Sequence, residues 1–379
     1  MHELTSILSS WSQCEARGGS GVLATVVDVR GSAYRHPGAR MLLTSDGSRV
    51  GSISGGCLEN DVATKSWWWT GGGKAVVRVY DTTSDDEAVW EFGLGCNGVV
   101  RVLLERLDTA GSKALIAFLN LCRVERKYGV VATVIGSPSP DAAQIGDRWF
   151  LEPDGGTAGS ITDMMVRDWT EAEADAALLS RRSRLLTIPH SLGPVEVFVE
   201  VVAPPVNLIL FGAGPDAVPV VRLAKEIGWH VTVADARPLY AQSRRFPEAD
   251  RVVLTQSDRP LGDIDIETDS VAVVMNHNFA ADRNVLTGLL AFNLPYIGVL
   301  GPLARTERIL SDLNIRQFPN RLHAPVGLDI GGDTPELIAL SILAEIQTAL
   351  SGRSARMLRT VALESRTSVE PSDRIPLCA

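Results

Sequence analysis

The sequence predicts an α/β chain in which a C-terminal Rossmann-like parallel sheet follows an α+β domain built from two internal repeats. Three observations predict this fold class. A G-x-G-x-x-A fingerprint follows an apolar run, the first half of the chain repeats itself, and a stiff Pro204-Pro205 linker separates the two parts. The predicted boundaries are 1–203 for the repeat domain, 206–350 for the Rossmann-like domain, and 351–379 for a polar tail.

The repeat appears when the first half is compared with itself at an offset of 108 residues. Residues 22–53 align without gaps on 130–161, and 12 of the 32 positions are identical. The shared pattern predicts a β-branched strand, a loop, a second strand, an Asp-Gly turn and a Gly-Ser-Ile segment. Helices are expected next, then further strands, so that the copies cover about 22–104 and 130–202. Among the shared positions are Arg40 and Arg148.

Features that both copies share are expected to serve the fold, whereas features found in one copy are better candidates for chemistry. Only the first copy carries Gly55-Gly56-Cys57 before its helix, where the second copy has Asp163. Cys57 therefore stands at a predicted helix N-terminus, which favours the thiolate form of a cysteine. A small buried core residue is the alternative reading of Cys57.

The remaining cysteines can be sorted by the same criterion, namely whether their surroundings occur in one copy alone. Cys96 lies in a glycine-rich turn over 93–98, which again occurs in the first copy alone. It is the second candidate for reactivity. Cys14, Cys122 and Cys378 have no such surroundings and are expected to be structural or incidental. An odd number of cysteines without a CxxC pair or framework spacing fits a reducing compartment.

The Rossmann fingerprint begins after the apolar run 206–211, which predicts a buried parallel strand. Gly212 and Gly214 allow a tight turn and the close approach of a phosphate, and Ala217 is the third small residue. The helix that follows supplies N–H donors and the positive end of its dipole. A Rossmann scaffold that has lost its ligand remains the alternative.

Charged residues near this turn are the next candidates. Asp235 ends the following strand, 23 residues after Gly212, where an acid accepts hydrogen bonds from ribose hydroxyls. Asp216 stands beside the phosphate seat and repels a phosphate unless Arg237 or a cation compensates. These residues complete the predicted nucleotide site.

Loops at the carboxyl ends of later strands carry further candidates, because ligands of such sheets bind there. His277, with Asn276 and Asp282 nearby, is a candidate general acid or base, and a loop-bracing histidine is the alternative. Asp329 lies between glycines ahead of a helix predicted over 337–350. Thr334 is its expected N-cap and Pro335 its first residue, which leaves Asp329 unexplained by capping.

Two other features of the sequence can be explained without a functional role. Arg35 and His36 lie in a loop that could meet an anion but is as readily only solvated. Trp67-Trp68-Trp69 follows Cys57 on its helix, and three consecutive large rings cannot all face one core. The run is therefore expected to be a core or dimer-contact feature, and a homodimer is our expectation.

Composition excludes several classes of protein. A net charge of −9 argues against sequence-independent nucleic-acid binding. No apolar run reaches the roughly 18 residues that span a bilayer, and the N-terminal residues lack the pattern of a secretory signal. The sequence thus predicts a cytoplasmic protein without a membrane partner.

Several stretches together resemble the XdhC/CoxF family of accessory proteins for xanthine dehydrogenase and carbon monoxide dehydrogenase. They are GSAYRHPGARMLLTSDG, GSISGGCLENDV, GLGCNG, LILFGAGPDA and HAPVGLDIGGDTPELIALSILAEI. The resemblance places the family's cysteine motifs on Cys57 and Cys96 and its Rossmann turn on Gly212 and Gly214. Two positions depart from the family pattern: Pro215 replaces its usual histidine, and Asn276-His277 replaces its Thr-His pair.

The resemblance implies binding of the molybdenum cofactor, a phosphate-bearing pterin that some enzymes use as a dinucleotide. It also implies assistance with sulfuration and delivery to a molybdenum hydroxylase, with a cysteine desulfurase as a further partner. On this hypothesis the phosphate rests on the turn 212–217 while a thiolate of Cys57 or Cys96 faces the metal, in a cleft between the domains.

Two rival functions remain open at this point. An NAD(P)-dependent oxidoreductase would use the Rossmann-like domain directly, and a non-catalytic scaffold would only bind a partner enzyme. The chain is too short for a complete xanthine dehydrogenase and lacks the iron–sulfur cysteine spacing of one.

Overall fold

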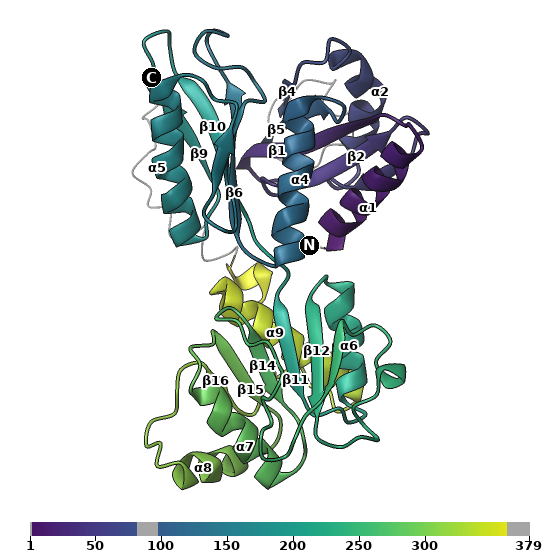
Figure 1. Ribbon diagram of the computed structural model, residues 1–379, viewed down its shortest axis with the longest axis vertical. Helices are drawn as coiled ribbons and strands as arrows, with labels where there is room; N and C mark the ends of the chain where they lie inside the picture. Colours follow the sequence, from purple (N-terminus) through teal and green to yellow (C-terminus); the bar gives the residue numbers. More distant parts are fainter. Residues whose placement is uncertain (1, 82–97, 362–379) are drawn as a thin grey trace, which may run out of the picture. The chain divides into compact units, whose positions relative to one another are not determined.

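The computed structural model describes residues 2–81 and 98–361, and the chain divides into two compact units, Met1–Pro205 and Val206–Ala379 (Figure 1). Unit 1 contains two five-stranded antiparallel sheets, and unit 2 contains one six-stranded parallel sheet. The predicted fold class, a Rossmann-like sheet preceded by an α+β part, is confirmed. No helix of the described ranges is both long and apolar enough to cross a membrane.

The two sheets of unit 1 have equivalent strands in equivalent order. The first has the order β3-β2-β1-β5-β4 and the second the order β8-β7-β6-β10-β9. The strands of the first are β1 (Gly21–Gly31), β2 (Arg40–Thr44), β3 (Arg49–Gly51), β4 (Val76–Asp81) and β5 (Gly98–Arg106). Those of the second are β6 (Gly129–Gly136), β7 (Arg148–Leu151), β8 (Thr157–Gly159), β9 (Arg184–Ile188) and β10 (Val195–Val202).

The helices of unit 1 follow the same duplication. α2 (Glu59–Trp69) packs against the first sheet, and α5 (Met164–Ser180) packs against the second. One more helix precedes each copy, α1 (His2–Ala16) and α4 (Ala110–Glu125). Their starts differ by the same offset of 108 residues, so each structural copy begins with a helix that the sequence comparison did not include.

The tryptophan run on α2 has a mixed environment. Trp67 and Trp69 are half-buried against the first sheet, and their rings lie under the guanidinium groups of Arg106 and Arg78, at 4.5 and 4.4 Å. Trp68 points outward and is 79% exposed. As expected from their spacing, the three rings do not share one core.

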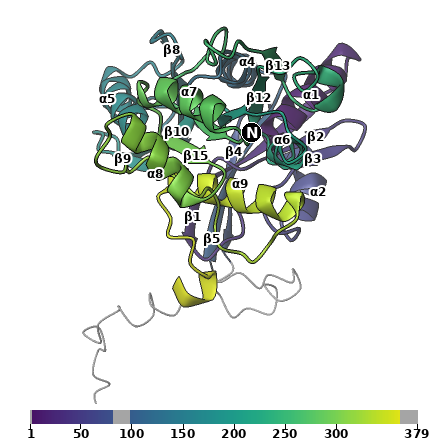
Figure 2. The same ribbon diagram turned by 90° about the horizontal axis from the view of Figure 1, so that it is seen from below.

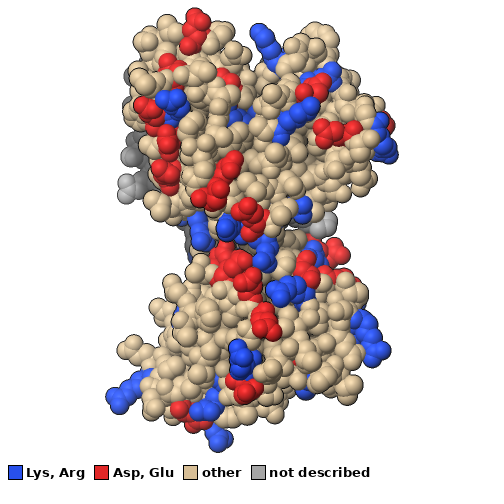
Figure 3. Space-filling view, in the orientation of Figure 1, with Lys and Arg blue, Asp and Glu red and all other residues tan. Residues whose placement is uncertain are grey.

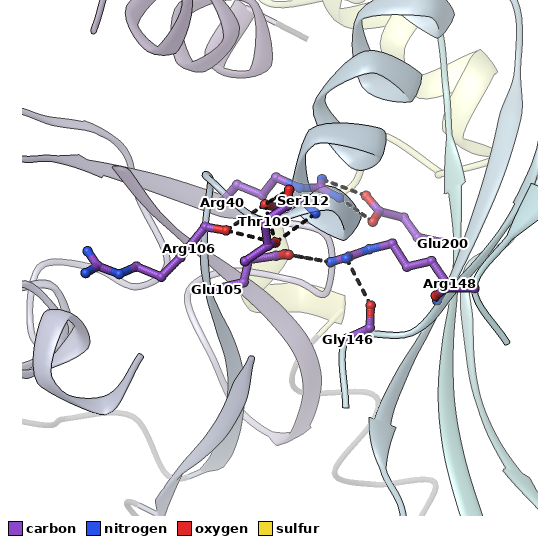
Figure 4. Close-up of polar contacts among 9 residues, drawn as sticks. Arg40, Glu105, Arg106, Thr109, Ser112, Gly146, Arg148 and Glu200 are labelled. Atoms are coloured by element: carbon purple, nitrogen blue, oxygen red, sulfur yellow. Dashed lines mark hydrogen bonds and ion pairs between the residues drawn. The ribbon is translucent and has the colours of Figure 1, made fainter. Parts of the chain in front are cut away.

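Two buried ion pairs connect the copies of unit 1 (Figure 4). Arg40 of β2 donates to Glu200 of β10 at 2.8 and 2.5 Å. Arg148 of β7 donates to Glu105 of β5 at 2.6 and 2.8 Å. Arg40 and Arg148 are equivalent by the repeat, and Glu105 and Glu200 are equivalent by strand register, facing Leu23 and Val131. Each copy therefore supplies an arginine to the other copy's glutamate.

Unit 2 is a parallel sheet with helices on both faces (Figures 1 and 2). The strand order is β13-β12-β11-β14-β15-β16, with the sequence reversing direction beside β11. The strands are β11 (Asn207–Phe211), β12 (His230–Asp235), β13 (Arg251–Leu254), β14 (Val271–Val274), β15 (Tyr296–Val299) and β16 (Leu322–His323).

The helices of unit 2 divide between two core clusters. One face of the sheet packs against α6 (Ala217–Glu226) and α9 (Pro335–Ser351). The other packs against α7 (Phe279–Leu290) and α8 (Leu303–Asp312). A short 3₁₀ turn, η1, covers Ser243–Arg245. The predicted N-cap of α9 is confirmed, because the Thr334 side chain accepts a hydrogen bond from the Leu337 N–H.

Charges on the surface are of both signs. On the face drawn in Figure 3, lysine and arginine lie among aspartate and glutamate on each unit. This mixture agrees with the moderate net charge of −9.

The burial of the Arg148–Glu105 pair predicts what removal of one partner does to stability. Its side chains are 3% and 4% exposed, so Glu105→Leu leaves a buried arginine charge without its partner. We expect this variant to lose roughly 3–5 kcal/mol of unfolding free energy. The double variant Glu105→Leu/Arg148→Leu removes both charges and is expected to lose clearly less. Urea unfolding of the three proteins measures the difference; equal losses in the single and double variants would contradict it.

Candidate functional site

Cys57 lies in the loop between β3 and α2, and Ser54 organises that loop. The Ser54 hydroxyl oxygen accepts the backbone N–H groups of Gly56 and Leu58, each at 3.1 Å. The Cys57 thiol lies 3.5 Å from the same oxygen and donates to it. The loop thus curls around one buried hydroxyl, and the half-buried thiol is held at the start of α2.

Glu59, the first residue of α2, holds the other side of the loop. Its carboxylate accepts the Ser54 N–H at 2.8 Å, the Ile53 N–H at 3.2 Å and the Ser52 hydroxyl at 2.9 Å. The Ser54 hydroxyl also donates to it. Burial raises the pKa of Glu59, but the hydrogen bonds from Ser54 and Ser52 outweigh burial and hold the pKa below its ordinary value.

The two glycines before Cys57 leave one side of the loop open. Gly56 has φ +112°, and a Cβ added there would have no neighbour within 4 Å. A Cβ on Gly55 would lie 3.5 Å from the Tyr34 ring, which packs against the loop. A ligand can therefore approach the backbone at Gly56 closely, next to the thiol.

Arg35 and His36 lie in the loop that contributes Tyr34. Arg35 is half-buried and pairs with Glu3, whose second carboxylate oxygen accepts the Ser52 N–H at 2.8 Å. Its charge is therefore already shared with a carboxylate. His36 is exposed.

The second copy has an ordinary helix start at the same place. The Asp163 side chain accepts the Val166 N–H at 2.9 Å and caps α5, with His190 3.5 Å from it. The glycine-cysteine loop of the first copy is therefore an elaboration that the fold itself does not need.

The other cysteines have different surroundings. Cys14 and Cys122 occupy equivalent positions on α1 and α4, and both are buried. Burial raises the pKa of the Cys122 thiol to about 12, so it is inert. The structural reading of these two residues fits their positions. Cys96 and Cys378 lie outside the described residues, and a role for Cys96 stays a prediction.

The glycine turn of unit 2 follows β11, beside the point where the strand order reverses. Gly212 has φ +119°, and a Cβ there would lie 2.5 Å from the carbonyl oxygen of Met275. Only glycine fits this position. Gly214 has open space, and the nearest atom to an added Cβ is Cδ2 of the His277 ring, at 4.0 Å. Ala217 is buried as the first residue of α6.

His277 and Asp216 meet beside this turn. His277 Nε2 lies 3.4 Å from Asp216 Oδ2, and Asp216 is the N-cap residue of α6 without a capping hydrogen bond of its own. His277 has φ +57°, a conformation that is unusual for a non-glycine residue. The pair stands where the helix N-terminus would meet a phosphate.

Asp235 is buried, and its carboxylate is fully engaged. It accepts the Ala213 N–H at 2.8 Å, the Arg237 N–H at 2.8 Å, and two guanidinium bonds from Arg237 at 2.9 and 2.6 Å. Burial raises the pKa of Asp235, and the hydrogen bonds from Arg237 and Ala213 bring it below its ordinary value. Asp235 thus braces the turn, and these bonds already occupy the acceptor sites that the predicted ribose contact would need.

The remaining candidates lie at later strand ends. Asp282 is completely buried; it accepts from the Asn276 side chain at 3.1 Å and pairs with Arg305. Burial raises the pKa of Asp282. Asp329 is exposed in the loop ahead of α9. Within residues 2–81 and 98–361, no three His, Cys, Asp or Glu side chains are grouped so that they could hold a metal ion.

The arrangement offers two kinds of chemistry. Unit 1 presents a half-buried thiol beside open glycine backbone, and unit 2 presents a glycine turn with open space at Gly214 before a helix N-terminus. Sequence reasoning missed Glu59 and Glu3, although a glutamate shortly after two serines is a signal for side chain to backbone bonding.

Comparison with known proteins gives the family. The model of the XdhC Rossmann domain matches residues 208–346, and that of the XdhC and CoxI family matches 14–81. A Bacillus subtilis protein, named as a probable subunit of xanthine dehydrogenase, is 35% identical over 325 residues. The match covers 86% of this chain and 92% of that protein.

The chain belongs to the XdhC family.

Other relatives of this XdhC-family chain extend over both units. The molybdenum cofactor insertion chaperone PaoD of Escherichia coli is 24% identical over 87% of this chain and 83% of its own length. A crystal structure from Bacillus halodurans, described as a xanthine dehydrogenase, is 30% identical with a TM-score of 0.75. It covers 92% of this chain, and 97% of the solved chain is matched. The resemblance inferred from the sequence motifs is thereby confirmed.

The hydrogen bonds to the Glu59 carboxylate predict a contribution to stability that depends on pH. Because its folded-state pKa lies below its ordinary value of 4.5, its stabilising effect is complete above that pH and is lost as pH falls through the folded-state pKa. We expect Glu59→Gln to lower stability by roughly 1 kcal/mol at pH 7. Thermal unfolding from pH 7 to pH 3 measures this effect. The gap between the two proteins should close toward pH 3, and a gap independent of pH would refute the role of the carboxylate.

The two glycines of the Rossmann turn give a matched pair of variants. Gly212→Ala forces a Cβ onto the Met275 carbonyl and is expected to lose roughly 2–4 kcal/mol. Gly214→Ala meets no atom closer than 4.0 Å, so its loss is expected to stay below about 1 kcal/mol. Calorimetric unfolding distinguishes them, and equal losses would show that the turn is not constrained as described.

Proposed function

We propose that this XdhC-family chain binds the molybdenum cofactor and assists its sulfuration and its insertion into a molybdenum hydroxylase of the xanthine or carbon monoxide dehydrogenase type. Support comes from relatives that span both units: one is named a cofactor insertion chaperone, and another is named as part of a xanthine dehydrogenase. The observation that carries the proposal is the Gly55–Cys57 loop, a thiol beside open backbone in one copy of a duplicated fold.

The residues present fit such a group in two respects. A sulfur ligand suits a soft, dithiolene-bound metal, and the Cys57 thiol is half-buried and held at its Sγ by Ser54. A phosphate monoester or pyrophosphate suits the glycine turn at Gly214, where an added Cβ would project into open space. When bound, the cofactor supplies the molybdenum centre that the recipient enzyme needs for catalysis.

The chain's own residues then have definite roles. Glu59 and Ser54 position the thiol, and Gly56 lets the ligand approach it. In unit 2, His277 faces Gly214 and offers a proton donor toward a phosphate, while it also pairs with Asp216. Sulfuration needs an external sulfur donor, for which we propose a cysteine desulfurase. A homodimer in the cytoplasm remains part of the proposal.

Anaerobic equilibrium binding of free molybdenum cofactor, measured by pterin fluorescence and molybdenum content, tests this function. We expect near-stoichiometric binding that weakens at least about tenfold in Cys57→Ser, since one charge-assisted or metal–sulfur contact exceeds 1.4 kcal/mol. Gly214→Ala is expected to weaken binding while unit 2 stays folded. Thr64→Ala, an exposed change on α2, is the control and should bind as the parent does.

Competition with NAD(H) belongs to the same experiment. Absence of cofactor binding together with tight NAD(H) binding would overturn the carrier function and favour an NAD(P)-dependent oxidoreductase. Cofactor binding that survives both variants would remove Cys57 and the turn from the site.

A further inference from the structure

Two arginines flank the outer side of the glycine turn in unit 2. The guanidinium carbon of Arg237 lies 3.9 Å from the centre of the Tyr240 ring, and that of Arg245 lies 4.8 Å from it. Arg245 also donates to the Ala213 carbonyl at 2.8 Å. The Ala213 N–H is bonded to Asp235. The peptide groups on the two sides of Ala213 are therefore fixed, one by Asp235 and the other by Arg245.

The carboxylate of Asp235 has no capacity left for a ligand. Two oxygens offer about four acceptor sites, and four donors occupy them: one from Ala213 and three from Arg237. A ribose diol bound at this strand end would have to displace Arg237 from its bidentate pair with the buried Asp235. Breaking such a pair leaves a buried charge unpaired.

The side chain that is exposed at this position is that of Arg237. The side chain of Arg237 is 47% exposed, whereas that of Asp235 is 2% exposed. Asp235 balances one of the two arginine charges beside Tyr240, so the cluster carries a surplus positive charge. Phosphate monoesters bind arginines in bidentate fashion, with roughly twice the strength of neutral hydrogen bonds. A diol offers neither the charge nor the geometry.

We propose that Arg237 and Arg245 bind the 2′-phosphate of an NADP-type nucleotide whose other phosphates lie on the glycine turn, and that the site disfavours the unphosphorylated ribose. An arginine near the end of this strand accommodates such a phosphate in Rossmann domains generally. The proposal concerns the outer group of a nucleotide and does not depend on the molybdenum cofactor. It shares with the proposed function only the glycine turn as a phosphate seat.

Titration calorimetry with adenosine 2′,5′-bisphosphate and adenosine 5′-monophosphate tests the preference, with NADP⁺ and NAD⁺ as a second pair. The full chain is expected to bind the 2′-phosphorylated member of each pair about tenfold tighter or more. Arg237→Met and Arg245→Met should each reduce that ratio toward one. Arg244→Met is the matched control, because this exposed neighbour bonds to Gln242 instead and should leave the ratio unchanged.

Arg237→Met deprives the buried Asp235 of its partner, so its thermal unfolding is measured beside its binding. Arg245→Met keeps the Asp235–Arg237 pair and carries the test if Arg237→Met does not fold. Equal affinity within each pair, a preference that survives in Arg245→Met, or no binding of either adenosine phosphate at millimolar concentration would overturn the proposal. Binding of the molybdenum cofactor is measured on the same preparations. If the protein binds the cofactor but does not distinguish the 2′-phosphorylated nucleotides, only this inference is contradicted. If it distinguishes the nucleotides but does not bind the cofactor, only the proposed function is contradicted.

Discussion

The reciprocal exchange of arginine and glutamate between the two copies is the interaction on which unit 1 depends. Arg40 reaches Glu200 and Arg148 reaches Glu105, so neither copy satisfies its own buried charges. A buried charge without a partner is expensive, so neither arginine can stay buried once the other copy's glutamate is lost. Two residues of each copy, Val27 and Leu103 with Ile135 and Phe198, also form a small shared core. The duplication is therefore one cooperative unit.

The duplication of unit 1 also accounts for the position of the candidate site in one copy. The charges and the core that the fold needs are present twice, so loops at the ends of the sheets can differ without loss of the scaffold. The first copy differs in this way at the start of α2, where Ser54 and Glu59 stand in place of an ordinary N-cap and hold Cys57. The second copy keeps a plain aspartate cap at Asp163. A side chain at a rigid helix start is more precisely placed than one on a free loop.

The sequence predicts much of this architecture. Glycines and apolar alternation are local signals, so the sheets, the Rossmann turn and the cap at Thr334 follow from them. The recurrence of Arg40 and Arg148 indicates a structural role, but their partners escape an ungapped comparison. Glu105 and Glu200 are 95 residues apart, not 108, because the connections before β5 and β10 differ in length.

Side-chain partnerships across the fold are the part that the sequence does not reveal. An acid at the end of β12 is a ribose acceptor by position, yet its lone pairs are taken by Ala213 and Arg237, which only the folded turn brings together. Glu59 likewise acquires its role from the backbone N–H groups that the loop turns toward it. Such roles depend on which hydrogen-bond donors the fold brings close to each carboxylate. Neither the periodicity nor the spacing of residues in the sequence contains that information.

In the proposed function, Cys57 is a sulfur ligand for the molybdenum cofactor. X-ray absorption at the molybdenum edge of the anaerobically loaded chain measures the sulfur neighbours of the metal directly. We expect one more molybdenum–sulfur contact in the parent than in Cys57→Ser, with the dithiolene contacts unchanged in both. Identical sulfur coordination in the two proteins would contradict the claim and leave the thiol outside the site.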